Sequence, residues 1–139
     1  MPTYPDAYNQ RGFLYGLKGQ LEKAIADYSM AIKLNPYNSL HYFNRGIAYY
    51  KKNDFDSAIA DLSKAIEMSP GREGFYSSRC AAFLLRDKFD QAVSDCSKAI
   101  ELDPVKASLY LDRSVVYEKM GRTDQAIADR KKYKELGGK

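Results

Sequence analysis

Apolar and small residues recur along this chain with a period of 34 residues. The segments AIADYSMAIKLNP (24–36), AIADLSKAIEMSP (58–70) and AVSDCSKAIELDP (92–104) are nearly the same, and each ends in proline. A fourth copy, AIADRKKYKELGG (126–138), begins in the same way and then becomes polar. A fixed period of this length is typical of proteins built from stacked structural repeats.

Four repeats account for almost all of the 139 residues. They span 5–38, 39–72, 73–106 and 107–139, and we number the positions of each repeat from 1 to 34. Aromatic, arginine and small residues recur at repeat positions 4, 7, 8 and 11, and a second set recurs at positions 17, 20, 21, 24, 27 and 28. Both sets have helical spacing, so each repeat is predicted to form two helices joined by a short polar turn. In the first three repeats, proline at position 32 ends the second helix.

A single helix hairpin cannot bury its apolar faces alone, but stacked hairpins can. Small residues at positions 8, 20 and 27 let two helices approach closely, and the aromatic residues at positions 4 and 11 fill the flanking space. The sequence therefore predicts an all-α chain of four stacked helix hairpins, forming a single domain over residues 1–139.

These residues resemble the tetratricopeptide repeat (TPR) family. That family has the same period, aromatic residues at positions 4 and 11, small residues at positions 8, 20 and 27, and proline at position 32. The resemblance covers residues 5–139, but tyrosine replaces the usual tryptophan at position 4, and arginine replaces the usual leucine at position 7. Cys80 and Ser114 replace glycine at position 8. The resemblance implies a right-handed α-solenoid whose first helices line a concave side.

Arginine occurs at position 7 and aspartate at position 23 in every repeat, and an antiparallel hairpin brings these two positions to the same level. Because a guanidinium group suits a partly buried carboxylate, we expect structural ion pairs, either within each repeat or between neighbouring repeats. The residues concerned are Arg11, Arg45, Arg79 and Arg113 with Asp27, Asp61, Asp95 and Asp129.

The two ends of the chain differ from its middle. We interpret the last second helix as a polar cap, because Arg130 and Lys134 replace the mostly apolar residues of earlier repeats and a solenoid needs such an end. Alternatively, RKKYKELGGK (130–139) is a basic tail for an acidic partner. At the other end, Leu14 has no preceding repeat to cover it. Tyr4 or a second copy of the chain could do so, which makes weak self-association at this end a hypothesis.

The composition is that of an ordinary globular chain, with 29% charged residues and a net charge of +4. That charge is too small and too evenly spread to indicate nucleic-acid binding. The N-terminus lacks the apolar segment of a signal peptide, and the longest apolar run, Cys80–Leu85, is too short to span a membrane. Cys80 and Cys96 are too few for a disulfide framework, so we expect two buried thiols and a reducing, cytoplasmic compartment.

No group of residues suggests catalysis. His41 is the one histidine, and it has no second ligand at a spacing that metal sites use. The sequence contains no nucleophile with an evident base and no phosphate-binding glycine motif. We therefore expect no enzymatic activity, no cofactor and no metal.

Function is expected instead on the concave face, which consists of repeat positions 2, 5, 6, 9, 12 and 13. A stripe that faces solvent is normally polar, but this one carries many large apolar side chains, which favours a binding surface. Asn9 and Asn44 are expected to hydrogen-bond the backbone of a bound segment. The predicted groove residues are Asn9, Phe13, Leu17, Leu40, Phe43, Asn44, Ile47, Tyr50, Ser78, Ala81, Leu85 and Leu111.

The resemblance also bears on one kind of partner, the acidic C-terminal tails of chaperones. Family members that bind such tails hold the carboxylate with lysine, asparagine and further basic residues from three repeats. At these positions the present chain has Asn9, Phe13, Asn44, Gly74 and Ser78, of which only Asn44 matches. Capture of a chaperone tail is therefore not expected.

The sequence thus predicts a non-enzymatic scaffold that binds an apolar or amphipathic protein segment in its concave groove. Two alternatives are a structural or self-association module and a fragment of a larger repeat protein. Single-stranded RNA binding is disfavoured, because the groove is short of lysine and arginine.

Overall fold

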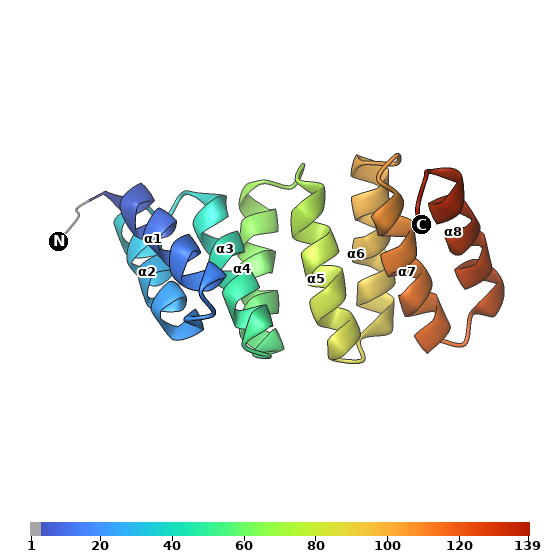
Figure 1. The fold of residues 1–139 in the computed structure, drawn as a ribbon, viewed down its shortest axis with the longest axis horizontal. Helices are drawn as coiled ribbons and strands as arrows, with labels where there is room; N and C mark the ends of the chain where they lie inside the picture. Colours follow the sequence, from blue (N-terminus) through green and yellow to red (C-terminus); the bar gives the residue numbers. More distant parts are fainter. Residues whose placement is uncertain (1–3) are drawn as a thin grey trace. The chain divides into compact units, whose positions relative to one another are not determined.

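The computed structural model describes residues 4–139, and over this range it contains eight α-helices and no strand (Figure 1). The helices are α1 (Pro5–Leu17), α2 (Leu21–Leu34), α3 (Ser39–Lys51), α4 (Phe55–Met68), α5 (Glu73–Leu85), α6 (Phe89–Leu102), α7 (Ala107–Lys119) and α8 (Thr123–Glu135). Each odd-numbered helix packs against the even-numbered helix that follows it, so every predicted repeat forms one hairpin. The predicted all-α repeat fold is confirmed.

The chain divides into two compact units, of which the first ends at Pro70 and the second begins at Gly71. In the first unit, α2 packs against α3 as well as against α1. In the second unit, α6 likewise packs against both α5 and α7. Each unit therefore consists of two hairpins that share apolar contacts. That the whole chain forms one domain, and that it curves with a right hand, stay predictions.

The turn within each hairpin bends at repeat position 15, where the backbone dihedral φ is positive. Gly19 and Gly121 hold this position in the first and last repeats, with φ of 70° and 71°. Asn53 and Asp87 hold it in the second and third, with φ of 64° and 56°. A left-handed backbone is open to glycine and, among other residues, mainly to asparagine and aspartate. All four residues are therefore of types that let the chain reverse within a short turn.

Repeat positions 8 and 24 face each other across a hairpin and share a limited space. In the first unit, position 8 is glycine and position 24 is large. A Cβ atom on Gly12 would lie 3.0 Å from the ring of Tyr28, and one on Gly46 would lie 3.1 Å from Cγ of Leu62. The absence of a side chain on each glycine is what lets the buried Tyr28 and Leu62 fit.

In the second unit the same two positions are filled differently. Cys80 at position 8 lies opposite Cys96 at position 24, and both are buried. In the last hairpin, buried Ser114 stands at position 8, while Arg130 at position 24 is exposed and donates a hydrogen bond to Glu118. In the first three hairpins, side-chain volume at one position thus falls where it rises at the other, and in the last hairpin the large side chain lies outside the shared space.

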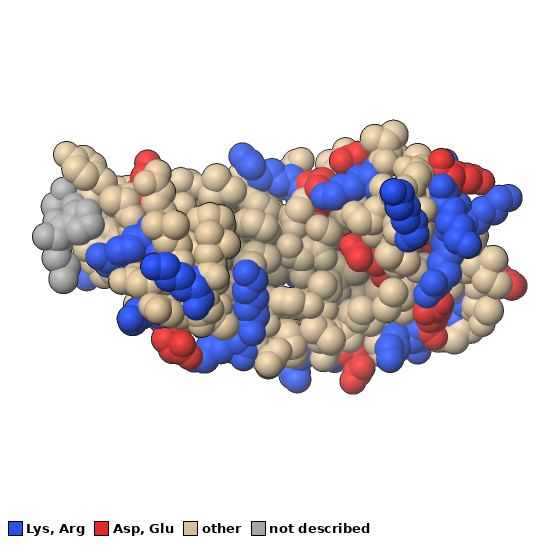
Figure 2. Space-filling model, viewed as in Figure 1, with Lys and Arg blue, Asp and Glu red and all other residues tan. Residues whose placement is uncertain are grey.

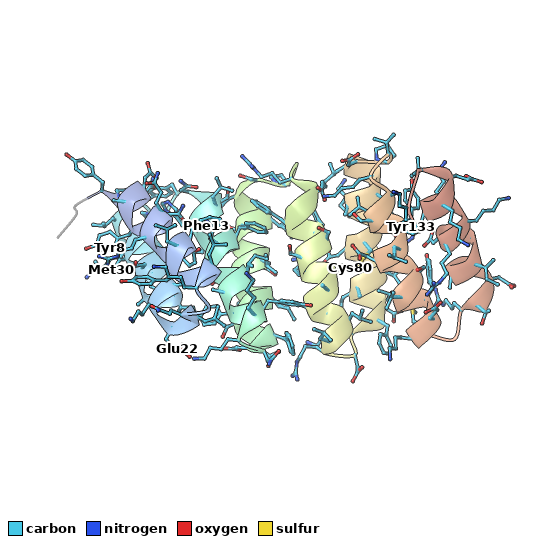
Figure 3. All side chains as sticks on the ribbon, in the orientation of Figure 1. Tyr8, Phe13, Glu22, Met30, Cys80 and Tyr133 are labelled. Carbon is cyan, nitrogen blue, oxygen red and sulfur yellow. A yellow bond between two sulfur atoms is a disulfide. The ribbon has the colours of Figure 1, made fainter. Side chains whose placement is uncertain are left out.

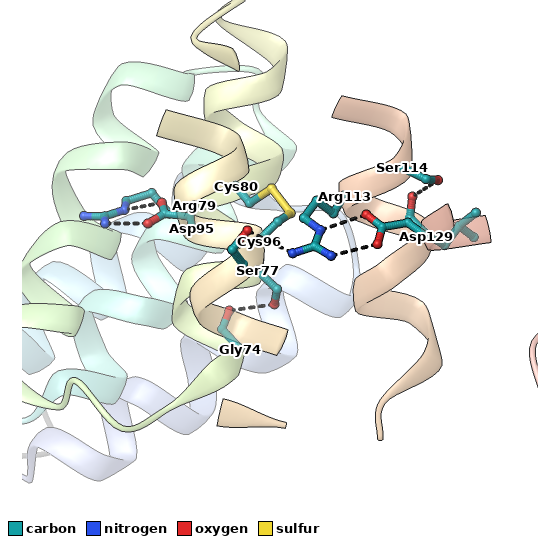
Figure 4. The surroundings of a disulfide bond; sticks show 11 residues. Gly74, Ser77, Arg79, Cys80, Asp95, Cys96, Arg113, Ser114 and Asp129 are labelled. Carbon is teal, nitrogen blue, oxygen red and sulfur yellow. Dashed lines mark hydrogen bonds and ion pairs between the residues drawn. A yellow bond between two sulfur atoms is a disulfide. The ribbon is translucent and has the colours of Figure 1, made fainter. Parts of the chain in front are cut away.

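An arginine–aspartate pair joins the two helices of every hairpin. Nε and Nη2 of the arginine donate to the two carboxylate oxygens of the aspartate, at 2.7 or 2.8 Å in all four repeats. The pairing lies within each repeat rather than between repeats. Figure 4 shows two of these pairs, Arg79 with Asp95 and Arg113 with Asp129.

Candidate functional site: an apolar groove in the first unit

A groove with apolar walls runs along the first unit, and α1 and α3 supply most of its lining. It consists of two adjoining hollows, with cavity volumes of about 280 Å³ and about 570 Å³. Phe13, Phe43 and Asn44 line both hollows. We call this feature the first-unit groove. It exists because the first helices of two successive repeats present the same apolar positions side by side.

Most of the groove residues predicted in this unit do line it. Asn9 and Leu40 lie in one hollow, Leu17 and Ile47 lie in the other, and Phe13, Phe43 and Asn44 lie in both. Phe13, which is labelled on α1 in Figure 3, is 53% exposed, and Leu17 is exposed as well. Phe43 and Ile47 are partly buried.

Tyr50 has a different neighbour. Its ring packs edge to face against Phe55 at the start of α4, with 5.5 Å between the ring centres. The contact holds the end of α3 to the next helix. Tyr50 was predicted to face the groove, but it lines neither of the two hollows described here.

Asn9 and Asn44 bond to each other across the groove. Nδ2 of Asn44 donates to Oδ1 of Asn9 at 2.9 Å, which links α1 to α3. The sequence predicted that both would bond a bound segment, and part of their capacity is instead used within the protein. This bond uses Nδ2 of Asn44 and Oδ1 of Asn9. Among the bonds of the described residues, the side-chain NH2 group of Asn9 is still able to donate, and the side-chain carbonyl of Asn44 is still able to accept. Together they offer one donor and one acceptor, which is what a peptide group requires.

Sequence reasoning missed the contribution of the second helix to this groove. Leu21 and Tyr28 of α2 line the smaller hollow beside Phe13 and Lys51. Burial raises the pKa of the Tyr28 hydroxyl, so this part of the wall is uncharged at neutral pH. Tyr28 could have been found from the glycine at position 8, because that glycine leaves room for a large residue next to α1.

The groove residues predicted in the second unit are described separately. Ala81 lines a small hollow of about 110 Å³ together with Leu84 and Asp112. Burial raises the pKa of Asp112, while Lys106 lowers it and Glu73 raises it further. Leu85 is exposed, and Ser78 and Leu111 are partly buried.

The prediction of two buried thiols is wrong, because Cys80 and Cys96 form a disulfide that joins α5 to α6 (Figure 4). Both residues are buried, as expected, in a cluster that includes Ala92 and Val116. They stand at facing positions of one hairpin, with Cα atoms 5.5 Å apart, and this is ordinary disulfide geometry. The sequence argument counted cysteines but did not ask whether these two positions meet. A disulfide is also more typical of oxidising compartments than of the reducing one expected.

Other chemistry is sparse over residues 4–139. No group of three or more histidine, cysteine or acidic side chains there could hold a metal ion. His41 is buried, and its Nε2 lies 3.7 Å from a carboxylate oxygen of Asp6. No helix in this range is both long enough and apolar enough to cross a membrane. Lysine, arginine and acidic side chains are interspersed on the face shown in Figure 2, with wide uncharged areas between them.

Solved structures with the same fold include several of MamA. One crystal structure of MamA is 22% identical, covers 97% of this chain and 79% of its own, and has a TM-score of 0.92. A MamA fragment from Desulfovibrio magneticus RS-1 is 18% identical, covers 96% of this chain and 76% of its own, and also has a TM-score of 0.92. At these identities, the likeness shows the fold alone.

Another neighbour is a structure of the first TPR domain of Spaghetti (RPAP3) bound to the HSP90 peptide SRMEEVD. It is 24% identical, covers 84% of this chain and 93% of its own, and has a TM-score of 0.82. No curated protein matched the sequence.

Family models described as tetratricopeptide repeat match residues 5–38, 40–71 and 107–136. These three segments are the first, second and fourth predicted repeats, and together they cover more than half of the chain. The third repeat, which carries the disulfide, lies outside the matches. By its sequence period, its helix hairpins and these matches, the chain belongs to the tetratricopeptide repeat family.

Proposed function

We propose that this protein is a non-enzymatic interaction scaffold that binds an apolar or amphipathic peptide segment in the first-unit groove. The observation that carries the proposal is the exposure of Phe13 and Leu17 beside a hollow that Phe43 and Ile47 also line. Large apolar side chains gathered at one exposed, concave place are typical of a binding surface.

The asparagine pair supports an extended or partly extended ligand. Asn44 lines both hollows, Asn9 lines the larger one, and together they offer one donor and one acceptor. A peptide bound along the groove could satisfy both with a single peptide group, while its side chains fill the hollows on either side. The hydrogen bond between the two asparagines fixes the direction of both amides before the ligand arrives, which lowers the entropy cost of binding.

The groove favours a ligand different from the one bound in the RPAP3 structure. The peptide in that structure, SRMEEVD, is acidic and ends in aspartate. In the present chain, Phe13 stands where tail-binding members have asparagine, and Asn9 stands where they have lysine. An acidic tail would lose its cationic partner here, whereas an apolar side chain would gain contact with Phe13.

The experiment uses a displayed library of random peptides, selected against the full chain. We expect the enriched peptides to carry two or more apolar residues and no preference for a C-terminal aspartate. A selected peptide is then measured by fluorescence polarisation against Phe13→Glu and against Tyr37→Glu. Tyr37 is a matched control, because it is a highly exposed aromatic residue of the same unit and lines neither hollow.

Phe13→Glu is expected to weaken binding at least tenfold with no change in melting temperature, and Tyr37→Glu is expected to leave both unchanged. The proposal fails if no selected peptide is sensitive to Phe13→Glu. It also fails in its choice of ligand if the peptide SRMEEVD binds and that binding is lost in Asn44→Ala.

A further inference from the structure

A second surface adjoins the groove on the outward face of α1, at repeat positions 3, 7 and 10, and Leu14 at position 10 also lines the larger hollow. In the first repeat these positions are Ala7, Arg11 and Leu14. The same positions in α3 and α7 are covered by the second helix of the preceding repeat. These covered faces show, within this protein, what the face of α1 is built to contact.

The covered faces are dry and hydrogen-bonded. Ala48 on α3 is 4% exposed and clusters with Tyr28 of α2, and Val116 on α7 is fully buried against Cys96 of α6. Beside each of them, an arginine donates from Nη1 to a serine hydroxyl of the covering helix. Arg45 donates to Ser29, and Arg113 donates to Ser97, both at 3.0 Å.

The corresponding face of α1 is open. Leu14 is 56% exposed, and the Arg11 side chain is 48% exposed, against 21% for Arg45 and for Arg113. Arg11 uses Nε and Nη2 for Asp27, and its third nitrogen, Nη1, has no hydrogen-bond acceptor among residues 4–139.

The free donor of Arg11 is held in place. The guanidinium carbon lies 5.4 Å from the centre of the Tyr8 ring and 6.0 Å from that of Tyr15, so the group is sandwiched as well as ion-paired. A fixed donor beside an exposed leucine is one half of the contact that α3 completes with α2 and that α7 completes with α6.

We propose that this face of α1 docks an amphipathic helix of another protein, which supplies small apolar side chains to Leu14 and a hydroxyl acceptor to Nη1 of Arg11. The two covering helices define the pattern that such a helix would carry. In α2 the contact residues include Ala24, Tyr28 and Ser29, and in α6 the equivalents are Ala92, Cys96 and Ser97.

Charge argues against a second copy of this chain as the occupant. α8 carries Arg130 and Lys131 where α2 carries Tyr28 and Ser29, so docking α8 would place two cations next to Arg11. Docking α1 on α1 would oppose two copies of Arg11. Like charges in contact disfavour both arrangements. Within each unit, α2 and α6 already use their serine-bearing faces on α3 and α7.

The experiment adds a stapled helical peptide with the sequence of α2, LEKAIADYSMAIKL, to the full chain. Binding is followed by fluorescence polarisation, and the site is mapped by amide chemical shifts. A matched peptide carries lysine in place of the serine, as α8 does at that position. We expect the α2 peptide to bind and to shift amides of α1, and the lysine peptide to bind at least tenfold more weakly.

Two variants test the surface. Leu14→Glu is expected to weaken the α2 peptide at least tenfold, whereas Ile127→Glu, an equally exposed apolar residue on α8, has no effect. Leu17→Glu changes a residue that lines only the smaller hollow, which Leu14 does not line. It is expected to weaken a groove peptide but to leave this binding unchanged, which separates this proposal from that for the groove. No binding, or binding insensitive to Leu14→Glu, overturns the proposal. A dimer in sedimentation that Leu14→Glu abolishes overturns the choice of partner.

Discussion

Arg45 and Asp61 are joined by two nearly parallel hydrogen bonds, of 2.7 and 2.8 Å, between the two helices of the second hairpin. The carboxylate is buried and most of the guanidinium is covered, so the pair lies inside the first unit rather than on its surface. The hydrogen bonds to Asp61 raise the pKa of Arg45 above its ordinary value, so the guanidinium group stays charged. The two hydrogen bonds fix the position of α4 relative to α3 along the helix axes.

Replacing Asp61 with alanine should strand this arginine. Breaking a buried pair by removing one partner costs roughly 3–5 kcal/mol, and we expect about 3 kcal/mol here because some of the Arg45 side chain still meets water. Urea denaturation of the full chain measures the loss in free energy of unfolding. Asp27→Ala should cost less, because its partner Arg11 is half exposed and water can solvate it once it is alone. Equal losses for the two variants would contradict this account.

Adding a methyl group should have opposite effects at two glycines of the first unit. Gly46→Ala places a Cβ 3.1 Å from Cγ of Leu62, which is fully buried and would have to shift to make room. Overpacking of this kind costs about 1–3 kcal/mol, which exceeds the gain of about 1 kcal/mol in helix propensity. Gly16→Ala meets no atom within 4 Å and should stabilise the protein by up to about 1 kcal/mol. Melting temperatures that rise for both variants would show that Leu62 can yield.

Reduction should weaken the hairpin formed by α5 and α6. The bond between Cys80 and Cys96 closes a loop of 16 residues, and a loop of that size is worth about 3 kcal/mol. We expect the urea midpoint to fall when a phosphine reductant is present. The double variant Cys80→Ala/Cys96→Ala should not respond to the reductant. Two titratable thiols in the unreduced, unfolded protein would show that the bond had not formed.

Acid should weaken the start of α4 through its capping residue. Oδ1 of Asp54 accepts from the backbone amide of Ser57 at 3.2 Å, and hydrogen bonds from Ser57 lower the pKa of Asp54 below its ordinary value of 3.8. Because the pKa is lower in the folded state, the added stability is complete above pH 3.8. It is lost as the pH falls through the folded pKa.

Asp54→Asn is the matched variant, because asparagine caps a helix about as well but does not titrate. The two proteins should therefore be about equally stable at neutral pH, and the protein with Asp54 should become the less stable of the two as the pH falls below 3.8. A difference that stays constant down to pH 2 would assign no role to the charge of Asp54.

The repeating part of the fold could be predicted because each repeat states it again. Tyrosine at position 4, small residues at positions 8, 20 and 27, and the aspartate at position 23 all point to the same two helices. The arginine at position 7 could be paired with that aspartate from spacing alone. The further hydrogen-bond partner of this arginine, outside its own hairpin, could not be predicted. Ser29 meets Arg45 only once one hairpin stacks on the next.

The candidate groove was harder to predict, since it depends on contacts between side chains of different repeats. Apolar periodicity selects Phe13 and Leu40, but it does not show that Asn9 and Asn44 bond to each other. It also does not reveal that Tyr28, from a second helix, reaches the same hollow as Phe13. The disulfide was missed for a related reason: counting cysteines ignores where the chain places them.

The exchange of volume between positions 8 and 24 limits how the repeats can be recombined. A consensus sequence that chooses each repeat position independently could combine glycine at position 8 from one repeat with cysteine at position 24 from another. That combination would leave a void. The consensus could equally combine cysteine with leucine, which would collide. Anyone who splices hairpins of this protein, or derives an idealised version from it, must transplant both members of each couple together.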